Sequence, residues 1–526
     1  MSRYFNTAGP IRHDDHYYIE PLERFDLEEI LMLIEQKKYF VFHAPRQTGK
    51  TTYLLALMKY LNQQEKYKAL YTNIENAQAA RENVKKGMQA IMSTLADDAF
   101  NRLDDPFMKE HWKTVLEENG EFSALNHILS IWCRANEKPI VLFIDEIDAL
   151  VGDTLIAVLR QLRSGYEKRP VFFPHSIVLC GIRDVKDYRI HSDAEKAVIT
   201  GGSAFNIKAR SLKMGNFTPQ EIEKLYRQHS TETGQPFAGD VFPLVWNLTQ
   251  GQPWLVNALA YETCFEMKSG RDRRIEITVD MIQQAKENLI LRRETHLDQL
   301  ADKLKEERVK NVLMPILVGS EDIKKIPDDD IDYVVDLGLI KRKPQLAIAN
   351  RIYQEIIPRQ LTNSAQATIV QESSWYMTVE GRLDMDKLLT AFQEFFRRHF
   401  ESWVDGFDYA EAGAQLLLQA YLQRIVNGGG RVEREYGLGR QRTDLLLLWP
   451  YKDGRQEVVI ELKLLYGSLE ATIEKGLEQT RQYMDKCGTR EGYLLIFNRA
   501  PGLTWEEKIF KRENVVKGVN IIVYGM

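Results

Sequence analysis

The sequence lacks the features that mark zinc proteins, disulfide-rich secreted proteins and membrane proteins. It contains no C-x-x-C pair, and its few cysteines are scattered along 526 residues at Cys133, Cys180, Cys264 and Cys487. No stretch approaches the roughly 18 apolar residues of a membrane span, and the N-terminus has no apolar signal core. A net charge of −5 argues against a uniformly basic nucleic-acid coat protein but leaves room for a local basic groove. We therefore expect a cytoplasmic protein with no membrane partner.

A phosphate-binding loop is predicted after the first strongly apolar run. Residues 39–43, YFVFH, are typical of a buried strand and are followed by APRQTGKTT and then by a helical pattern. This order fits the P-loop pattern G-x-x-x-x-G-K-S/T, although Ala44 takes the place of the first glycine. Lys50 would contact the β- and γ-phosphates and Thr51 would bind Mg²⁺, while Gly49 lets the backbone come close. The residues expected at the nucleotide are Ala44, Pro45, Arg46, Gln47, Thr48, Gly49, Lys50, Thr51 and Thr52.

Two further strands end in residues suited to ATP hydrolysis. IVLFIDEID, residues 140–148, is apolar until it delivers two carboxylates. Asp145 would hold Mg²⁺ through water and Glu146 would polarise the attacking water. SIVLCGIRD, residues 176–184, ends in Arg183, which is placed to reach the γ-phosphate. The alternatives are a solvated acidic turn and a surface arginine.

Residues 1 to about 365 resemble the AAA-like ATPases of the STAND group, which couple nucleotide state to an attached effector. The phosphate motifs carry this resemblance together with the leader FNTAGP…HYYIEP, residues 5–21, which is similar to the segment over the adenine. LTQGQPWLVNALA, residues 248–260, resembles the G-x-P segment of the helical lid, which implies that Pro253 packs near the base or ribose. Residues 298–362 are expected to form three helices and then a hairpin, as a winged-helix domain. We favour packing of that domain on the nucleotide site over DNA binding.

A second carboxylate pattern follows near the C-terminus. TDLLLLW, residues 443–449, begins a predicted strand with Asp444, and EVVIELKLL, residues 457–465, places Glu461 and Lys463 on one strand face. The preceding helix pattern, residues 411–426, carries Glu411 in line with apolar positions. Asp444 and Glu461 would bind Mg²⁺ or Mn²⁺, with Glu411 as a further ligand and Lys463 orienting water. The alternative is an edge strand with a solvated face.

Residues 400–526 resemble the PD-(D/E)xK nucleases in this order of helix, strand, strand and helix, with Thr443 in place of the proline of the name. IEKGLEQTRQYMDKC is similar to the Q-x-x-x-Y element of RecB-like nucleases, which implies that Gln479 and Tyr483 lie beside the active site and contact DNA or the metal shell. Arg440 and Arg442 are candidates for contacts with phosphates. The favoured nucleic acid is DNA.

The sequence therefore predicts a multidomain α/β protein. Its parts are a P-loop AAA-like core with a parallel sheet (1–215), a helical lid (216–295), a winged-helix domain (296–362), a linker (363–400) and a restriction-endonuclease-like α/β domain (401–526). The leading hypothesis is an ATP-dependent switch on a metal-dependent nuclease, in defence against foreign DNA or mobile elements by analogy alone. The alternative is a signalling or scaffold ATPase whose nuclease-like domain binds nucleic acid without cutting. Self-association into a homo-oligomer is left open, and a DNA-translocating motor ranks last.

Overall fold

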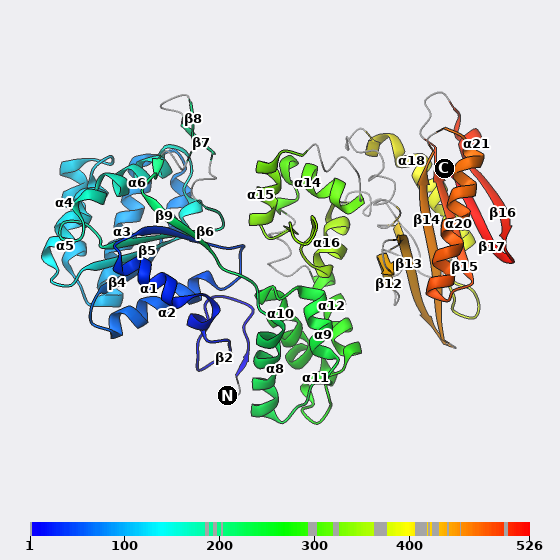
Figure 1. Ribbon diagram of the computed structural model, residues 1–526, viewed down its shortest axis with the longest axis horizontal. Coiled ribbons are helices and arrows are strands. Elements are labelled where there is room, and N and C mark those ends of the chain that lie inside the picture. Colours follow the sequence, from blue (N-terminus) through cyan, green and yellow to red (C-terminus); the bar gives the residue numbers. More distant parts are fainter. Residues whose placement is uncertain are drawn as a thin grey trace. The chain divides into compact units, whose positions relative to one another are not determined.

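The computed structural model divides into two compact units. The N-terminal unit comprises Met1–Asp298 and Pro327–Ile352, and the C-terminal unit comprises Gln299–Ile326 and Tyr353–Met526 (Figure 1). The residues that the structure describes are 3–184, 189–192, 197–200, 204–292, 302–318, 326–361, 376–404, 418, 421–422, 431–438, 441–452, 454–465, 467–498 and 503–526. Among the described helices, none is both long and apolar enough to cross a membrane.

The centre of the N-terminal unit is a parallel sheet of five strands in the order β4-β5-β6-β3-β9. The strands are β3 (Tyr39–His43), β4 (Lys68–Asn73), β5 (Ile140–Asp145), β6 (Ser176–Gly181) and β9 (Lys208–Lys213). Every residue of β3, β5 and β6 is buried, which explains their uninterrupted apolar sequences. The predicted parallel α/β sheet is confirmed.

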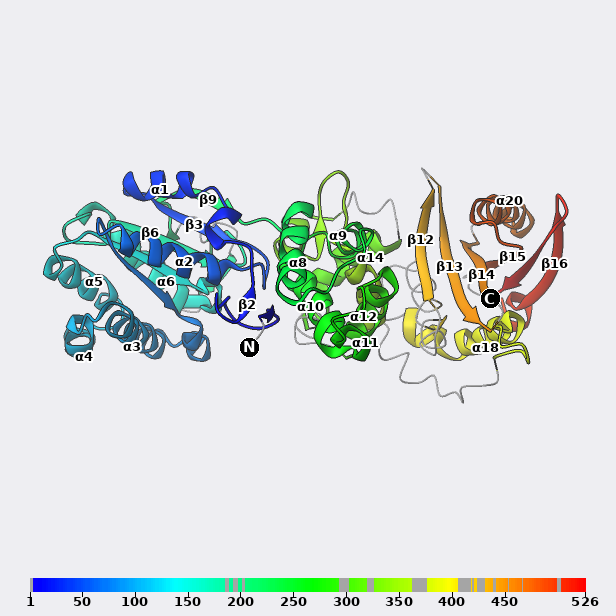
Figure 2. The same ribbon diagram turned by 90° about the horizontal axis from the view of Figure 1, so that it is seen from below.

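Helices cover both faces of this sheet (Figure 2). One face carries α1 (Leu27–Glu35) and α2 (Lys50–Gln63). The other carries α3 (Val84–Leu103), α4 (Phe107–Asn119), α5 (Ala124–Ala135) and α6 (Gly152–Ser164). Phe40 and Phe42 pack with α1 and α2, whereas Val41 packs on the opposite face, as the two-residue period of a strand requires. The phosphate-binding loop therefore leaves a rigid central strand.

A short leader and a group of helices make up the rest of the unit before residue 293. The leader forms the parallel pair β1 (Tyr4–Phe5) and β2 (His16–Tyr17), then the 3-10 turn Pro21–Arg24. The helical lid contains α8 (Pro219–Thr233), α9 (Val241–Thr249), α10 (Pro253–Tyr261), α11 (Lys268–Arg271) and α12 (Val279–Arg292). Thr218 and Glu221 form a capping box that fixes the start of α8. β7 (Arg189–Ser192) and β8 (Ala197–Thr200) form a small hairpin after β6.

The segment expected to be a winged helix ends in a helix that follows its hairpin. It contains α14 (Glu307–Val318), α15 (Asp328–Asp336), the antiparallel pair β10 (Ile340–Lys341) and β11 (Ala347–Ile348), and then α16 (Arg351–Leu361). The hairpin thus follows α14 and α15, and one further helix, α16, comes after it. Ile352, Tyr353, Ile356 and Ile357 are all buried, and their spacing is that of a helix rather than of a strand.

The C-terminal unit contains a sheet of six strands in the order β12-β13-β14-β15-β17-β16. They are β12 (Arg431–Leu438), β13 (Gln441–Tyr451), β14 (Gly454–Leu464), β15 (Glu491–Phe497), β16 (Phe510–Val516) and β17 (Val519–Gly525). β12, β13 and β14 are antiparallel, whereas β14, β15 and β17 run parallel. The predicted strands that contain Asp444 and Glu461 are present.

Two long helices lie on opposite faces of this sheet, α18 (Met385–Val404) and α20 (Leu469–Cys487) (Figure 2). Leu388 and Phe392 of α18 pack with Ile460, and Leu477 of α20 packs with Val459. A short helix, α21 (Trp505–Lys508), precedes β16. The described residues from 376 onward are therefore part of the C-terminal core, although the sequence suggested a linker as far as residue 400.

Candidate functional site

The phosphate-binding loop joins β3 to the first turn of α2. Gly49 has φ +96° and Gln47 has φ +57°, so the loop uses the left-handed backbone at two positions. α2 begins at Lys50, and its first amide groups are free to face an anion. Ala44 has no left-handed backbone and its methyl group is buried in the core beside β3. Its replacement of the usual glycine therefore leaves the loop intact.

Lys50 is held within the loop by neutral groups. Its Nζ donates hydrogen bonds to the carbonyls of Ala44 (3.0 Å) and Pro45 (3.2 Å), and the residue is only 6% exposed. No acidic side chain pairs with it in the described part of the chain. A buried ammonium group that forms no direct ion pair is only partly compensated by the more distant carboxylates of Glu146 and Asp148, so a phosphate is a favourable partner. Arg46, in the same loop, is exposed.

Asp145 and Thr51 meet as the sequence motifs predict. The Thr51 hydroxyl donates to Asp145 Oδ2 at 2.8 Å, and the Glu146 amide donates to Asp145 Oδ1 at 3.0 Å. A second hydroxyl, that of Tyr71 on β4, also donates to Asp145 Oδ2 at 2.8 Å. Asp145 has no exposed surface. Hydroxyl and carboxylate oxygens are ligands that Mg²⁺ accepts, so these residues fit the ion that accompanies ATP.

Glu146 follows β5 in a strained backbone conformation, with φ +58°. Burial and, to a lesser extent, the carboxylates of Asp148 and Asp145 raise its pKa to about 7, against the opposing charges of Lys50 and Arg46. A carboxyl group that titrates near neutral pH can exchange a proton with water during a reaction. The geometry and the pKa of Glu146 therefore suit the role predicted for it.

Arg183, the predicted γ-phosphate sensor, contacts residues of α15. Its Nε lies 3.4 Å from Asp336 Oδ2, and its guanidinium lies 4.9 Å from the centre of the Tyr333 ring. Lys213, at the end of β9, approaches the other oxygen of Asp336 at 3.2 Å. A Cβ placed on Gly338 would lie 2.7 Å from Pro45, so the turn after α15 packs directly on the phosphate-binding loop. The predicted packing of this segment on the nucleotide site is thus seen for residues 327–352.

The leader runs between α2 and the lid. Its Ile11 amide donates to the Thr52 hydroxyl at 3.3 Å, and Trp254 of α10 donates from Nε1 to the Thr7 carbonyl at 2.8 Å. Pro253 is the first residue of α10 and is buried beside Trp254. The leader, the P-loop helix and the G-x-P segment therefore come together on one side of the phosphate-binding loop, where the resemblance places the base.

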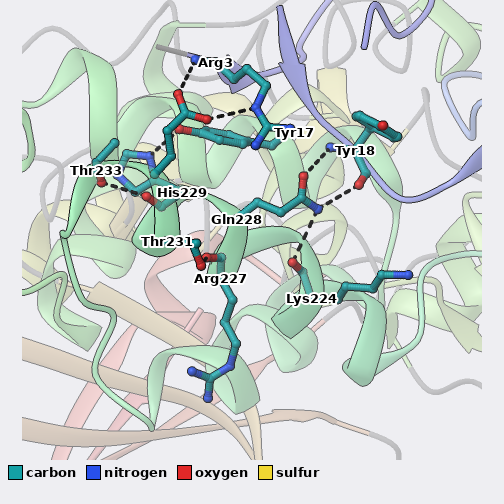
Figure 3. A network of polar contacts seen from close by, with 10 residues as sticks. Arg3, Tyr17, Tyr18, Lys224, Arg227, Gln228, His229, Thr231 and Thr233 are labelled. Carbon is teal, nitrogen blue, oxygen red and sulfur yellow. Dashed lines mark hydrogen bonds and ion pairs between the residues drawn. The ribbon is translucent and has the colours of Figure 1, made fainter. Parts of the chain in front are cut away.

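The far part of the leader is fixed to α8 by a polar network (Figure 3). Arg3 donates from its amide and from Nε to the two carboxylate oxygens of Glu232. The amide and carbonyl of Tyr18 both bond to the side-chain amide of Gln228. Tyr17 OH lies 3.3 Å from Nδ1 of His229, whose pKa is lowered by burial. These contacts keep the leader on the lid.

Arg24 connects the phosphate-binding loop with the start of the lid. It donates to the carbonyls of Thr48 (2.6 Å) and Gly215 (2.7 Å), and its guanidinium lies 4.5 Å from the centre of the Phe217 ring. Burial lowers its pKa to about 10. Every partner is neutral, because no described carboxylate lies within ion-pair distance of Arg24. The positive charge adds to the field that favours phosphate at Gly49.

Comparison of the chain with known protein families identifies the unit that contains this site. The AAA-like domain matches the chain over residues 6–357, which is more than half of its length. The chain belongs to the AAA-like domain family. The P-loop ATPase interpretation of the N-terminal unit is therefore confirmed, together with nucleotide binding as its function.

Solved structures similar to this AAA-like protein include P-loop proteins of low sequence identity. A Walker-type ATPase of Pyrococcus abyssi is 15% identical, and the match covers 67% of this chain and 99% of that one with a TM-score of 0.46. The T158V variant of RuvB from Thermotoga maritima is 12% identical, with 62% and 92% covered and a TM-score of 0.32. Domain III of the replication initiation protein DnaA from the same organism is 13% identical, with 51% and 92% covered and a TM-score of 0.31. The comparison with curated proteins gave no match.

The second candidate site of the AAA-like protein lies in the C-terminal unit, beyond the residues that the family matches. Glu461 on β14 is 2% exposed, and its Oε1 accepts a hydrogen bond of 2.6 Å from Lys463 Nζ. The intervening Leu462 belongs to the core on the α18 face, whereas Val459 belongs to the core on the α20 face. The predicted alternation along this strand is confirmed, with Glu461 and Lys463 on the face that α20 covers.

The remaining predicted residues of this site are only partly described. Leu445 pairs with Ile460, so one further step along the two strands brings the backbones of Asp444 and Glu461 next to each other. Glu411 and Arg440 lie outside the described residues, as do the side chains of Asp444 and Arg442. Among the described residues, no group of three or more acidic, histidine or cysteine side chains could hold a metal.

The two predicted residues of α20 differ in their surroundings. Tyr483 is buried and packs in the core cluster that includes Leu446 and Val459. Gln479 is half-buried, and its Oε1 is buried without a hydrogen-bond donor among the described residues. Tyr483 is thus a core residue in this structure, whereas Gln479 has an oxygen still open to a partner.

Sequence reasoning missed three residues that contact the nucleotide site, namely Tyr71, Arg24 and Asp336. None belongs to a spaced motif, because each reaches the site from a different element. Tyr71 lies among apolar strand residues and has the character of a core side chain. The only available signal for Asp336 was the expectation that its segment packs on the nucleotide site.

Proposed function

We propose that this AAA-like protein is an ATP-dependent switch of the STAND type that controls a metal-dependent nuclease in its C-terminal unit. The observation that carries the nuclease is the buried Glu461–Lys463 pair on the α20 face, next to the backbone of Asp444 on the adjacent strand. Carboxylates and a lysine on one face of a sheet are what metal-assisted phosphodiester hydrolysis requires. The proposed substrate is DNA.

The residues of the N-terminal unit have separate roles in ATP hydrolysis. Lys50 and the amides after Gly49 bind the phosphates, and Thr51 and Asp145 hold Mg²⁺. Bound Mg²⁺ supplies positive charge that neutralises the phosphate oxygens. Glu146 orients and polarises the attacking water, and its pKa of about 7 allows it to accept a proton. Pro253 and the leader cover the base.

The Arg183–Asp336 pair supports control by nucleotide. Asp336 is buried and pairs with Arg183, the residue proposed to contact the γ-phosphate of ATP. ADP has no γ-phosphate and leaves this pair undisturbed, whereas ATP competes with Asp336 for Arg183. Binding of ATP would therefore loosen residues 327–352 from the phosphate-binding loop, and a ligand can shift an equilibrium only through such a differential contact. Self-association into a homo-oligomer is a second route by which this change would act.

In the C-terminal unit, Asp444 and Glu461 would bind Mg²⁺ or Mn²⁺, with Glu411 as a further ligand. Lys463 would orient the attacking water. Gln479, Arg440 and Arg442 would contact the nucleic acid, and Tyr483 would support α20 from the core. A role in defence against foreign DNA or mobile elements follows by analogy alone.

The test is cleavage of supercoiled plasmid and of a matched RNA with Mg²⁺ or Mn²⁺, each with and without ATP. Wild type is compared with Lys50→Ala and Glu461→Ala, and with the exposed controls Lys66→Ala and Glu474→Ala. We expect metal-dependent cutting of DNA that Glu461→Ala abolishes and that ATP or Lys50→Ala alters. Cutting that persists in Glu461→Ala would refute the nuclease site, and cutting that ignores both ATP and Lys50→Ala would refute control.

A second candidate function is a signalling or scaffold ATPase whose C-terminal unit binds nucleic acid without cutting it. The observation that favours it is the neutralisation of Glu461 by Lys463. Binding of DNA in a gel-shift assay, with ATPase activity intact and no cleavage of DNA or RNA by the same preparation, would support this function.

A further inference from the structure

Tyr71 is a buried tyrosine whose hydroxyl reaches the candidate Mg²⁺ site. It lies on β4, where it pairs with Phe143 of β5, and its ring packs in the core between the sheet and α2. The guanidinium of Arg102 lies 5.2 Å from the ring centre and closes the outer side. The hydroxyl donates to Asp145 Oδ2 at 2.8 Å. A buried tyrosine hydroxyl needs a partner, and here the partner is the carboxylate of the acidic motif.

The acceptor positions of Asp145 are almost fully used. A carboxylate has about four lone-pair positions. Thr51 and Tyr71 occupy those of Oδ2, and the Glu146 amide occupies one of Oδ1. The orientation of the carboxylate is therefore set by three donors from three segments of the chain. The buried Cys180 thiol also lies against this carboxylate, and the Thr51 oxygen keeps its own lone pairs for the ion.

We propose that Tyr71 is a positioning residue for nucleotide-bound Mg²⁺, which acts by fixing the Asp145 carboxylate against Thr51. This inference rests on the proposed Mg²⁺ role of Thr51 and Asp145. Among the described residues, Tyr71 meets the site only at Asp145 and Thr51, the two residues proposed to hold Mg²⁺, so its effect should appear only when Mg²⁺ is present. A residue that merely filled the core would alter stability and leave the Mg²⁺ dependence unchanged.

The test uses the full chain and a fluorescent ATP analogue, titrated once with Mg²⁺ and once with EDTA. Tyr71→Phe removes one oxygen and keeps the ring. The matched control is Tyr53→Phe, since Tyr53 is equally buried in the same core cluster and its hydroxyl has no hydrogen-bond partner in the described part of the chain. We expect Tyr71→Phe to weaken binding about 10-fold with Mg²⁺ and to leave binding in EDTA unchanged, because it loses a hydrogen bond to a charged group. Tyr53→Phe should change neither.

A second variant separates the positioning role from the role of the site itself. Thr51→Val should also lose affinity only in Mg²⁺, and the double variant Tyr71→Phe with Thr51→Val should lose less than the product of the two single effects. Equal losses for Tyr71→Phe in Mg²⁺ and EDTA, or no loss in either, would overturn the inference. If wild type itself binds equally well with and without Mg²⁺, the proposed role of Thr51 and Asp145 fails, and the inference fails with it. If Thr51→Val shows the expected loss and Tyr71→Phe does not, only the inference on Tyr71 fails.

Discussion

Each of the two candidate sites contains a buried carboxylate and a lysine, but the two groups are hydrogen-bonded to each other in only one of them. In the N-terminal unit, Asp145 accepts hydrogen bonds from hydroxyl and amide groups, while Lys50 donates to backbone carbonyls. In the C-terminal unit, Glu461 and Lys463 bond directly to each other. The first arrangement keeps cation and anion apart, so that phosphate and metal each meet an unneutralised partner. In the second arrangement each charge already satisfies the other.

This difference has a thermodynamic consequence. A ligand of the N-terminal site replaces only neutral contacts of Lys50, whereas a metal at Glu461 has to displace an ammonium group. Burial makes the isolated charges costly, so the Glu461–Lys463 pair resists separation. We therefore expect the lysines to act in opposite directions on ligand binding.

The largest expected effect is that of Lys50→Met. Lys50 would make charge-assisted contacts with two phosphates, and their loss should weaken ATP binding about 100-fold or more. The stabilisation of the N-terminal unit by ATP should fall accordingly in calorimetry. Lys66→Met is the control, because Lys66 is exposed and pairs with Glu35 at the surface of the same unit. Retention of wild-type ATP affinity in Lys50→Met would show that Lys50 does not bind the phosphates.

Asp336→Asn tests the one feature that the two sites share, a cation paired with a buried carboxylate. Arg183 is paired with the carboxylate of Asp336. Removing that negative charge should free Arg183 for the γ-phosphate and raise the affinity for ATP relative to ADP by about 10-fold. The measurement is the ratio of the ADP and ATP dissociation constants, which cancels effects common to both nucleotides. Asp332→Asn serves as control, since Asp332 is exposed on the same helix and pairs with Arg342. An unchanged ratio in Asp336→Asn would mean that Asp336 and the γ-phosphate do not compete for Arg183.

Lys463→Met should strengthen metal binding while it removes cleavage. Without the ammonium group, Mn²⁺ meets an unpaired Glu461, and we expect about 5-fold tighter binding, equivalent to about 1 kcal/mol. Calorimetric titration with Mn²⁺ measures the affinity, and the exposed Lys475 on α20 provides the control Lys475→Met. Weaker Mn²⁺ binding in Lys463→Met would show that the lysine supports the metal rather than competing with it.

The smallest expected effect is a difference in acid stability between the two units. Burial lowers the pKa of His16, His43, His175 and His229, all of which lie in the N-terminal unit. Below the ordinary histidine pKa of about 6.5 the unfolded chain binds more protons than the folded one, so stability present above that pH is lost as the pH falls. No histidine side chain of the C-terminal unit is described.

A fall in pH from 7.5 to 5.5 should therefore lower the melting temperature of the N-terminal unit by a few degrees more than that of the C-terminal unit, as measured by calorimetry. The N-terminal transition is identified by its shift with ATP. Equal shifts of the two transitions would indicate that these histidines are not buried in their neutral form.

The sequence was sufficient where one segment contained both an element and its chemistry. Residues 39–43 and 140–145 form the predicted strands because their apolar side chains must be buried on both faces, and the motifs at their ends place Lys50, Thr51 and Asp145. The same holds for Glu461 and Lys463, whose shared face follows from the period of a strand.

It was insufficient where the site depends on contacts between distant segments. Tyr71, Arg24 and Asp336 reach the nucleotide site from separate elements, and no local pattern distinguishes them from core or surface residues. Residues 363–400 were assigned to a linker because α18 has no motif that ties it to the sheet.

The contact between the leader and the lid has a consequence for synthesis of the chain. The Thr7 carbonyl and Trp254 are 247 residues apart, and the two-residue strands β1 and β2 cannot hold together alone. About 200 residues separate the phosphate-binding loop from Trp254, so at a ribosomal rate of about 5–20 residues per second the loop is exposed for about 10–40 s before its cover has been translated. A nascent chain therefore carries the loop with the base side uncovered, and a nucleotide that binds early would be held by its phosphates alone.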